Sequence, residues 1–159
     1  MTSRDLLISW LKDAYAMEQA QIEILTRYIK DFSDYSRIKT GLEIHLAETK
    51  QQADDVQTCL KSLGSDVSGG KNLLGKLTGI AQGVATNIHK DDIVKDLLVL
   101  YGGENFEYAC YTSLVAAANE LGEDEIKTIC QRIASQEKNA ADMVFERIPV
   151  VTIDLMAKI

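Results

Sequence analysis

The chain has 159 residues, with 24 Asp and Glu against 17 Lys and Arg, so its formal net charge is −7. An acidic chain without a basic cluster is poorly suited to the phosphate backbone, which excludes nucleic acid as an expected partner. Hydrophobic residues make up 46% and charged residues 26%, which is typical of a folded globular protein. The length favours a single domain over residues 1–159.

Membrane and disulfide-rich classes are not expected either. No apolar run approaches the roughly 18 to 20 residues needed to cross a bilayer, and charged residues stand near the start of the chain at Arg4 and Asp5. We therefore expect a cytoplasmic protein with no membrane partner. Cys59, Cys110 and Cys130 are widely spaced and form no CxxC pair, which indicates small core residues rather than a disulfide framework or a zinc site.

Apolar residues recur at helical spacing in the first part of the chain. The first predicted helix covers about residues 3–32, with Thr2 or Ser3 as its cap. The second covers about residues 36–63 and ends before Gly64. A short turn joins them, which predicts an antiparallel helix hairpin.

The segment between the second predicted helix and residue 91 is long enough to carry the chain back along a helical bundle. Within it we expect a short amphipathic helix at about 72–88, from apolar residues at Leu73, Leu74, Leu77, Ile80, Val84 and Ile88. The predicted role of this segment is a long crossover between two helix hairpins.

Two further helices complete the predicted bundle. The first of them covers about 91–121 and ends before Gly122, and the second covers about 124–148. We expect Pro149 to end the last helix and to leave a short apolar tail at 149–159, which could serve an interface. No strand signal is present, so the fold class is all-α, a four-helix bundle.

Glutamates interrupt the apolar stripes of all four long helices. Core positions are occupied by Glu18, Glu104, Glu107 and Glu137, and Glu48 flanks one. Glutamate is rarely buried unless it is paired or binds something. One glutamate of each helix stands about 13 or 14 residues from the expected helix start, roughly 20 Å along the axis. We therefore expect these carboxylates to meet in one layer.

Carboxylates gathered in a low-dielectric interior cannot all stay ionised without compensation. No Lys or Arg lies in the stripes near that depth, so protons or metal ions must neutralise them. Two metal ions would roughly balance five negative charges, and hard or borderline metals accept carboxylate ligands. The pattern predicts a dinuclear metal site, with a protonated or water-bridged polar layer as the alternative.

Histidine ligands are sparse. Carboxylate-bridged bundles of this kind place a Glu-x-x-His pair on two helices, but Gln51 stands three residues after Glu48 and an alanine stands three after Glu137. His45 precedes Glu48 by three residues, so we expect it to bind metal or to orient a glutamate, with a core histidine as the alternative. We also expect Gln52 to lie near the same site.

Four segments, one in each long helix, carry a family resemblance: Asp13–Gln19, His45–Thr49, Glu104–Ala109, and Glu137 with Asp142. They resemble the helix signatures of the YciE/YciF-like branch of the ferritin-like superfamily, and the similarity runs over about residues 3–150. The resemblance implies a ferritin-like four-helix bundle and a bacterial cytoplasmic protein, often stress-associated, that forms a homodimer. It also implies a di-iron or related centre with the ligands Glu18, Glu48, Glu104, Glu107 and Glu137.

Two classes of function remain open. In the first, the protein binds two metal ions, iron in first place with manganese or zinc as alternatives, and His45 and Gln52 lie around the site. Its co-substrate would be O₂ or peroxide. In the second, the site is vestigial and the bundle acts through dimerisation or partner binding.

Overall fold

The structure is a computed structural model that describes residues 1–70 and 92–158. Within these residues the chain forms four long α-helices and no strand, which confirms the all-α prediction. The helices are α1 (Ser3–Asp31), α2 (Ser36–Ser62), α4 (Asp92–Glu120) and α5 (Asp124–Ala157). The short helix predicted at 72–88 lies outside the described residues.

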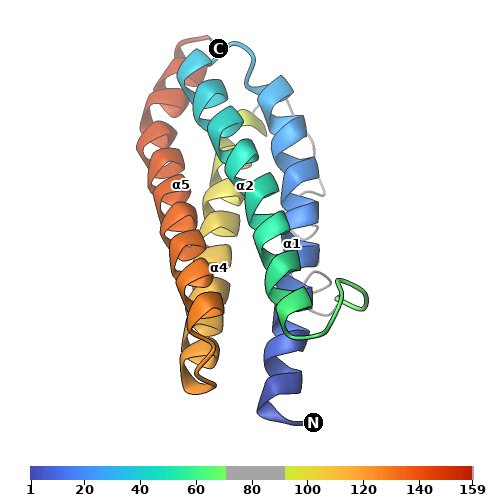
Figure 1. The fold of residues 1–159 in the computed structure, drawn as a ribbon. Helices are drawn as coiled ribbons and strands as arrows, with labels where there is room; N and C mark the ends of the chain where they lie inside the picture. Colours follow the sequence, from blue (N-terminus) through green and yellow to red (C-terminus); the bar gives the residue numbers. More distant parts are fainter. Residues whose placement is uncertain (71–91, 159) are drawn as a thin grey trace.

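The helices form a four-helix bundle made of two antiparallel hairpins (Figure 1). In one hairpin α1 packs against α2, and in the other α4 packs against α5; α1 also contacts α4, and α2 contacts α5. The helices α2 and α4 run in the same direction (Figure 1). No helix among the described residues combines the length and apolar character needed to cross a membrane.

Local signals explain most helix ends. The Thr2 hydroxyl accepts a hydrogen bond from the Asp5 backbone at 3.1 Å, and the Asp5 carboxylate accepts one from the Thr2 backbone at 2.7 Å. This capping box starts α1. Gly64 and Gly122 follow α2 and α4 with φ of 74° and 70°, a left-handed conformation that favours glycine and stops a helix.

The prediction that Pro149 ends the last helix is wrong, because α5 continues through Pro149 for two more turns. A proline inside a helix removes one N–H donor and costs about 3 kcal/mol. Tertiary contacts offset that cost. Val151 is buried in the core, and the Lys158 ammonium lies 5.0 Å from the centre of the Tyr35 ring. The predicted apolar tail is therefore mostly a continuation of α5, with Val151 buried and Val150, Ile153 and Met156 exposed.

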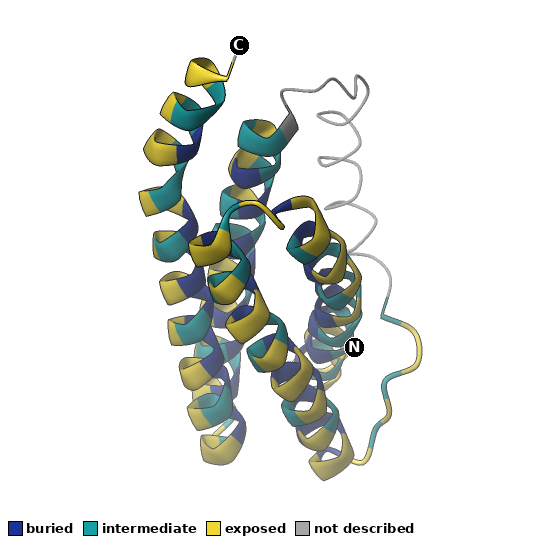
Figure 2. Ribbon diagram, turned by 90° about the horizontal axis from the view of Figure 1, so that it is seen from above, coloured by how far each residue is buried: buried dark blue, intermediate teal, exposed yellow. Residues whose placement is uncertain are grey.

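Buried residues lie along the inner faces of the helices (Figure 2). The apolar ones divide into two clusters. One contains residues such as Leu11, Val56 and Ile133. The other contains residues such as Leu25 and Leu97. Along each helix, buried polar residues stand between the positions that belong to the two clusters. The core is thus an apolar, a polar and a second apolar layer, and the polar layer holds the candidate site.

Candidate metal centre

Every long helix contributes to the polar layer. Its buried polar side chains are Glu18, Gln21, His45, Thr49, Gln52, Glu104, Glu107 and Glu137. The expectation of carboxylates meeting inside the bundle therefore holds for α1, α4 and α5. On α2 the buried positions are taken by His45, Thr49 and Gln52 instead of Glu48.

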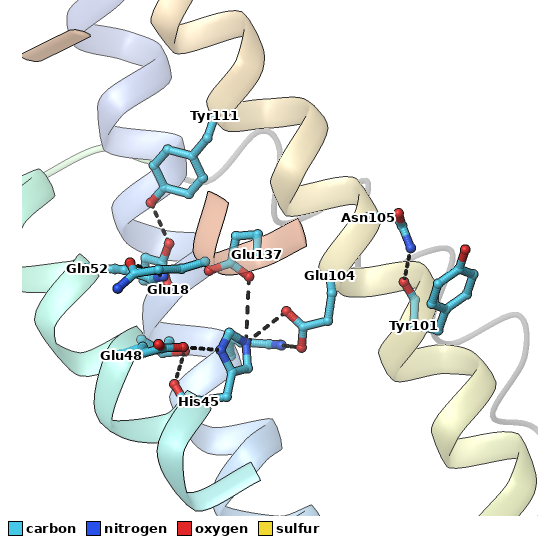
Figure 3. Close-up of polar contacts among 12 residues, drawn as sticks. Glu18, His45, Glu48, Gln52, Tyr101, Glu104, Asn105, Tyr111 and Glu137 are labelled. Carbon is cyan, nitrogen blue, oxygen red and sulfur yellow. Dashed lines mark hydrogen bonds and ion pairs between the residues drawn. The ribbon is translucent and has the colours of Figure 1, made fainter. Parts of the chain in front are cut away.

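One compact group of candidate ligands lies in this layer (Figure 3). His45 of α2, Glu104 and Glu107 of α4, and Glu137 of α5 each offer a ligand atom, and these atoms all lie within 4.8 Å of one another. Metal–ligand bonds of about 2.0–2.4 Å can span that separation around a common centre. We call these four residues the His45 group.

His45 links the carboxylates of three residues. Its Nε2 lies 2.9 Å from Glu104 Oε2 and 3.6 Å from Glu137 Oε2, and its Nδ1 lies 3.4 Å from Glu48 Oε2. Burial acts to lower the pKa of His45, but the charge of Glu104 and hydrogen bonds with Glu104 and Glu48 outweigh it and raise that pKa well above its usual value. Without a metal, His45 is a buried cation among carboxylates.

Glu48 lies at the edge of the layer rather than in the His45 group. Its side chain is 35% exposed, and it faces His45 Nδ1 from the same helix. Such a contact fixes the orientation of the imidazole and leaves Nε2 directed at the interior. Glu48, which was expected among the metal ligands, therefore lies where it can orient His45, whereas the sequence had suggested that His45 orients a glutamate.

Glu107 and Glu137 carry the strongest sign of a missing counter-charge. Burial, followed by the charges of neighbouring glutamates, raises the pKa of Glu137 to about 9 and the pKa of Glu107 well above its usual value. Both oxygens of Glu137 and Oε2 of Glu107 are buried, and no hydrogen-bond partner for them lies among residues 1–70 and 92–158. Unsatisfied buried carboxylate oxygens are costly, and a bound cation would satisfy them.

Glu18 belongs to the same layer but not to the His45 group. The Tyr111 hydroxyl donates a hydrogen bond to Glu18 Oε1 (Figure 3), whereas Glu18 Oε2 is buried without a partner. Burial raises the pKa of Glu18 to about 8, although the hydrogen bond from Tyr111 opposes the shift. Glu18 therefore adds a further carboxylate to the layer, outside the His45 group.

Three supporting contacts were not predicted from the sequence. Gln21 Nε2 donates to Glu104 Oε1 at 2.6 Å, Tyr111 donates to Glu18, and Gln52 Nε2 donates to Gln136 Oε1 at 3.1 Å. The only sequence signal for these contacts was a polar or hydroxyl-bearing residue at a core position, one helical turn from a glutamate. Gln52, which was expected around the site, is fully buried in the layer with its Oε1 unpaired.

Comparison with known proteins agrees with this architecture. A family model described as Domain of unknown function (DUF892) matches residues 2–153. A crystal structure of protein XCC3681 from Xanthomonas campestris is 29% identical, with a TM-score of 0.85, and the match covers 99% of this chain and 98% of that one.

Two more distant structures show the same fold. The Escherichia coli stress protein YciF is 20% identical with a TM-score of 0.80, over 93% of this chain and 95% of that one. A Desulfovibrio desulfuricans bacterioferritin, described with a diiron site, is 13% identical with a TM-score of 0.74, over 94% and 82% of the two chains. The chain therefore belongs to the DUF892 family, and it shares the fold of YciF and of this bacterioferritin.

Proposed function

We propose that this protein binds two metal ions in the polar layer, with iron as the first candidate and manganese or zinc as alternatives. The observation that carries the proposal is the convergence of His45, Glu104, Glu107 and Glu137 within 4.8 Å, with both Glu137 oxygens buried and unpartnered. Oxygen-rich ligands with one imidazole suit these metals. The bacterioferritin neighbour supports the same reading by analogy of fold.

Protons are the competing explanation for the buried charge. They would neutralise Glu18, Glu107 and Glu137, whose pKa values are raised. A protonated Glu137 would hydrogen-bond with Glu104 and Glu107, whereas a cation would be held by the four ligand atoms that lie within 4.8 Å of one another and would relieve the repulsion among the carboxylates. This difference favours metal over a purely structural polar layer.

The proposed activity is reaction with O₂ or peroxide, as part of a stress response in the cytoplasm. Iron bound in such a layer would supply electrons for the reduction of either co-substrate. The part played by the chain is to hold the ligands in a dry interior: His45, Glu104 and Glu137 are almost fully excluded from solvent. The similarity in fold to a stress protein supports this role.

We also propose a homodimer. Val150, Ile153 and Met156 are 62%, 69% and 71% exposed on the last turns of α5, and apolar side chains in such positions are often covered by a partner. Light scattering of the purified protein at several concentrations tests this, and a monomer at every concentration would contradict it.

The test of metal binding starts from protein purified without chelator. Elemental mass spectrometry is expected to find about two metal ions per wild-type chain, as in dinuclear carboxylate bundles, and less than half of that in Glu137→Gln. The matched control is Glu146→Gln, an exposed glutamate on the same helix, which should keep the wild-type metal content.

Reactivity is measured on the same preparations. Anaerobic Fe(II) is added to metal-free protein, air is admitted, and absorbance is recorded. Oxidation faster than in buffer by the wild type, and slower by Glu137→Gln, supports the proposed activity. Absence of bound metal together with buffer-rate oxidation would contradict both parts of the proposal.

A further inference from the structure

The layer holds its carboxylates in two different ways. Glu104, Glu107 and Glu137 lie with His45 in one compact group, whereas Glu18 lies outside that group and is bound by a phenol. Glu18 is still close enough for its charge to act on Glu107 and Glu137. A cation near Glu18 would therefore be a near neighbour of one in the His45 group, with a different set of ligands.

Glu104 and Glu18 share one arrangement. In Glu104, Oε1 accepts a hydrogen bond from Gln21 and Oε2 faces His45. In Glu18, Oε1 accepts a hydrogen bond from Tyr111 and Oε2 has no partner. In each case a neutral donor fixes one oxygen and leaves the other for the interior, which is how donors beyond the ligand shell orient metal-binding carboxylates.

Packing alone does not explain the Tyr111 hydroxyl. Tyr111 is fully buried and belongs to the apolar cluster that contains Leu11, Leu114 and Ile133. A phenylalanine would fill nearly the same volume there, and a hydroxyl in apolar surroundings is costly unless it is hydrogen-bonded. Within the part of the chain that the structure describes, this hydroxyl hydrogen-bonds to Glu18, so the polar function of Tyr111 is directed at that carboxylate.

We propose that Tyr111 is a positioning residue that orients Glu18 as a ligand of the second metal ion, so that the two ions bind with unequal affinity. The inference rests on the proposed metal binding. The first ion occupies the His45 group, whose ligand atoms already lie together. The second depends on Glu18 Oε2, and Tyr111 fixes the Glu18 carboxylate without touching the ion.

The test is an anaerobic titration of Mn²⁺ into metal-free protein, in which electron paramagnetic resonance counts the Mn²⁺ that stays free. The wild type should show two binding steps. Tyr111→Phe should leave the first step within about threefold and weaken the second about 10- to 100-fold, the usual range for loss of such a partner. Glu18→Gln should abolish the second step, and Tyr28→Phe, a buried tyrosine of the other apolar cluster, should change neither.

Each other outcome overturns the inference. Equal binding curves for wild type and Tyr111→Phe would show that the hydroxyl does not act on metal binding. Equal weakening of both steps would show a general effect on the layer. A single step in the wild type that Glu18→Gln leaves unchanged would remove Glu18 from the ligands.

Two checks distinguish failure of the role proposed for Tyr111 from failure of the proposed metal binding. Circular dichroism checks that each variant folds. If Tyr111→Phe does not fold, Glu18→Gln still tests whether Glu18 binds the second metal ion. Failure of the wild type to bind any Mn²⁺, Zn²⁺ or Fe(II) would defeat the proposed function itself, before the variants are compared.

Discussion

Glu137→Gln should make the metal-free protein more stable at neutral pH. Glu137 is fully buried, neither of its oxygens has a hydrogen-bond partner, and burial, followed by the charge of Glu104, raises its pKa to about 9. At pH 7 the unfolded chain therefore releases a proton that the folded chain keeps. Glutamine has no such proton to keep, so the variant avoids this cost.

The size of the effect follows from the two pKa values. The ordinary value is 4.5, so pH 7 lies about 2.5 units above it, and at about 1.4 kcal/mol per unit the cost is roughly 3 kcal/mol. A raised carboxyl pKa carries no cost below about pH 4.5 and a growing one up to about pH 9. The stability gain of Glu137→Gln should therefore be absent near pH 4.5 and increase with pH.

Urea unfolding with chelator present, at pH 5, 7 and 8, measures this difference. The control is Glu146→Gln, because Glu146 is exposed on the same helix and should show little change at any pH. A Glu137→Gln variant that is less stable than the wild type at pH 7, or a gain independent of pH, would refute the reasoning. With Mn²⁺ present the order should reverse, because the variant has lost a ligand.

Four further outcomes are expected. The metal-free wild type should lose stability as pH rises from 5 to 8, because the raised pKa values of Glu18 and Glu137 cost stability increasingly above about pH 4.5, and the raised pKa of His45 makes a contribution that is complete below about pH 6.5 and is then lost. A rise of metal-free stability with pH would contradict this. In thermal unfolding, Mn²⁺ at 100 times its Kd should add about 2.7 kcal/mol of stability. Gly102→Ala should stabilise α4 by about 0.5–1 kcal/mol in urea unfolding, since Gly102 is exposed and a Cβ would meet nothing within 4 Å; a loss would show that the glycine has a structural role. In urea unfolding, Val151→Ala should lower the free energy of unfolding by about 2 kcal/mol, because Val151 is buried. Val150→Ala should lower it by less than about 0.5 kcal/mol, because Val150 is exposed. Equal effects would show that burial of Val151 does not keep α5 helical beyond Pro149.

Local sequence signals were enough to place most helix boundaries. The capping residues Thr2 and Asp5 and the glycines Gly64 and Gly122 act within a few residues of the ends they define. The end of α5 was not predictable in this way, because the residues that keep it helical beyond Pro149 act through tertiary contacts. Burial of Val151 depends on the other helices, which a local proline rule does not include.

The candidate site shows the same division between local pattern and tertiary contact. The helical period correctly placed Glu18, Glu104, Glu107 and Glu137 in the interior. On α2 the buried face is formed by His45, Thr49 and Gln52. Glu48 precedes Thr49 by one residue, which is about 100° around the helix, and therefore lies at the edge of the layer.

Supporting contacts between helices leave no short-range pattern. Tyr111 and Glu18 are 93 residues apart in the chain, and Gln21 and Glu104 are 83 apart. Sequence spacing could place each of these residues on a buried face, but it could not pair them. The pairs become visible only when the bundle brings α1 and α4 together.

The position of bound metal distinguishes a metal centre from a polar layer held by protons. Crystals grown with Mn²⁺ or Fe(II) are measured by anomalous diffraction, which identifies the metal and its position. The account predicts the strongest peak within about 2.5 Å of His45 Nε2 and of carboxylate oxygens from Glu104, Glu107 and Glu137. A polar layer without a peak, in crystals whose surface carboxylates hold the same metal, would contradict it.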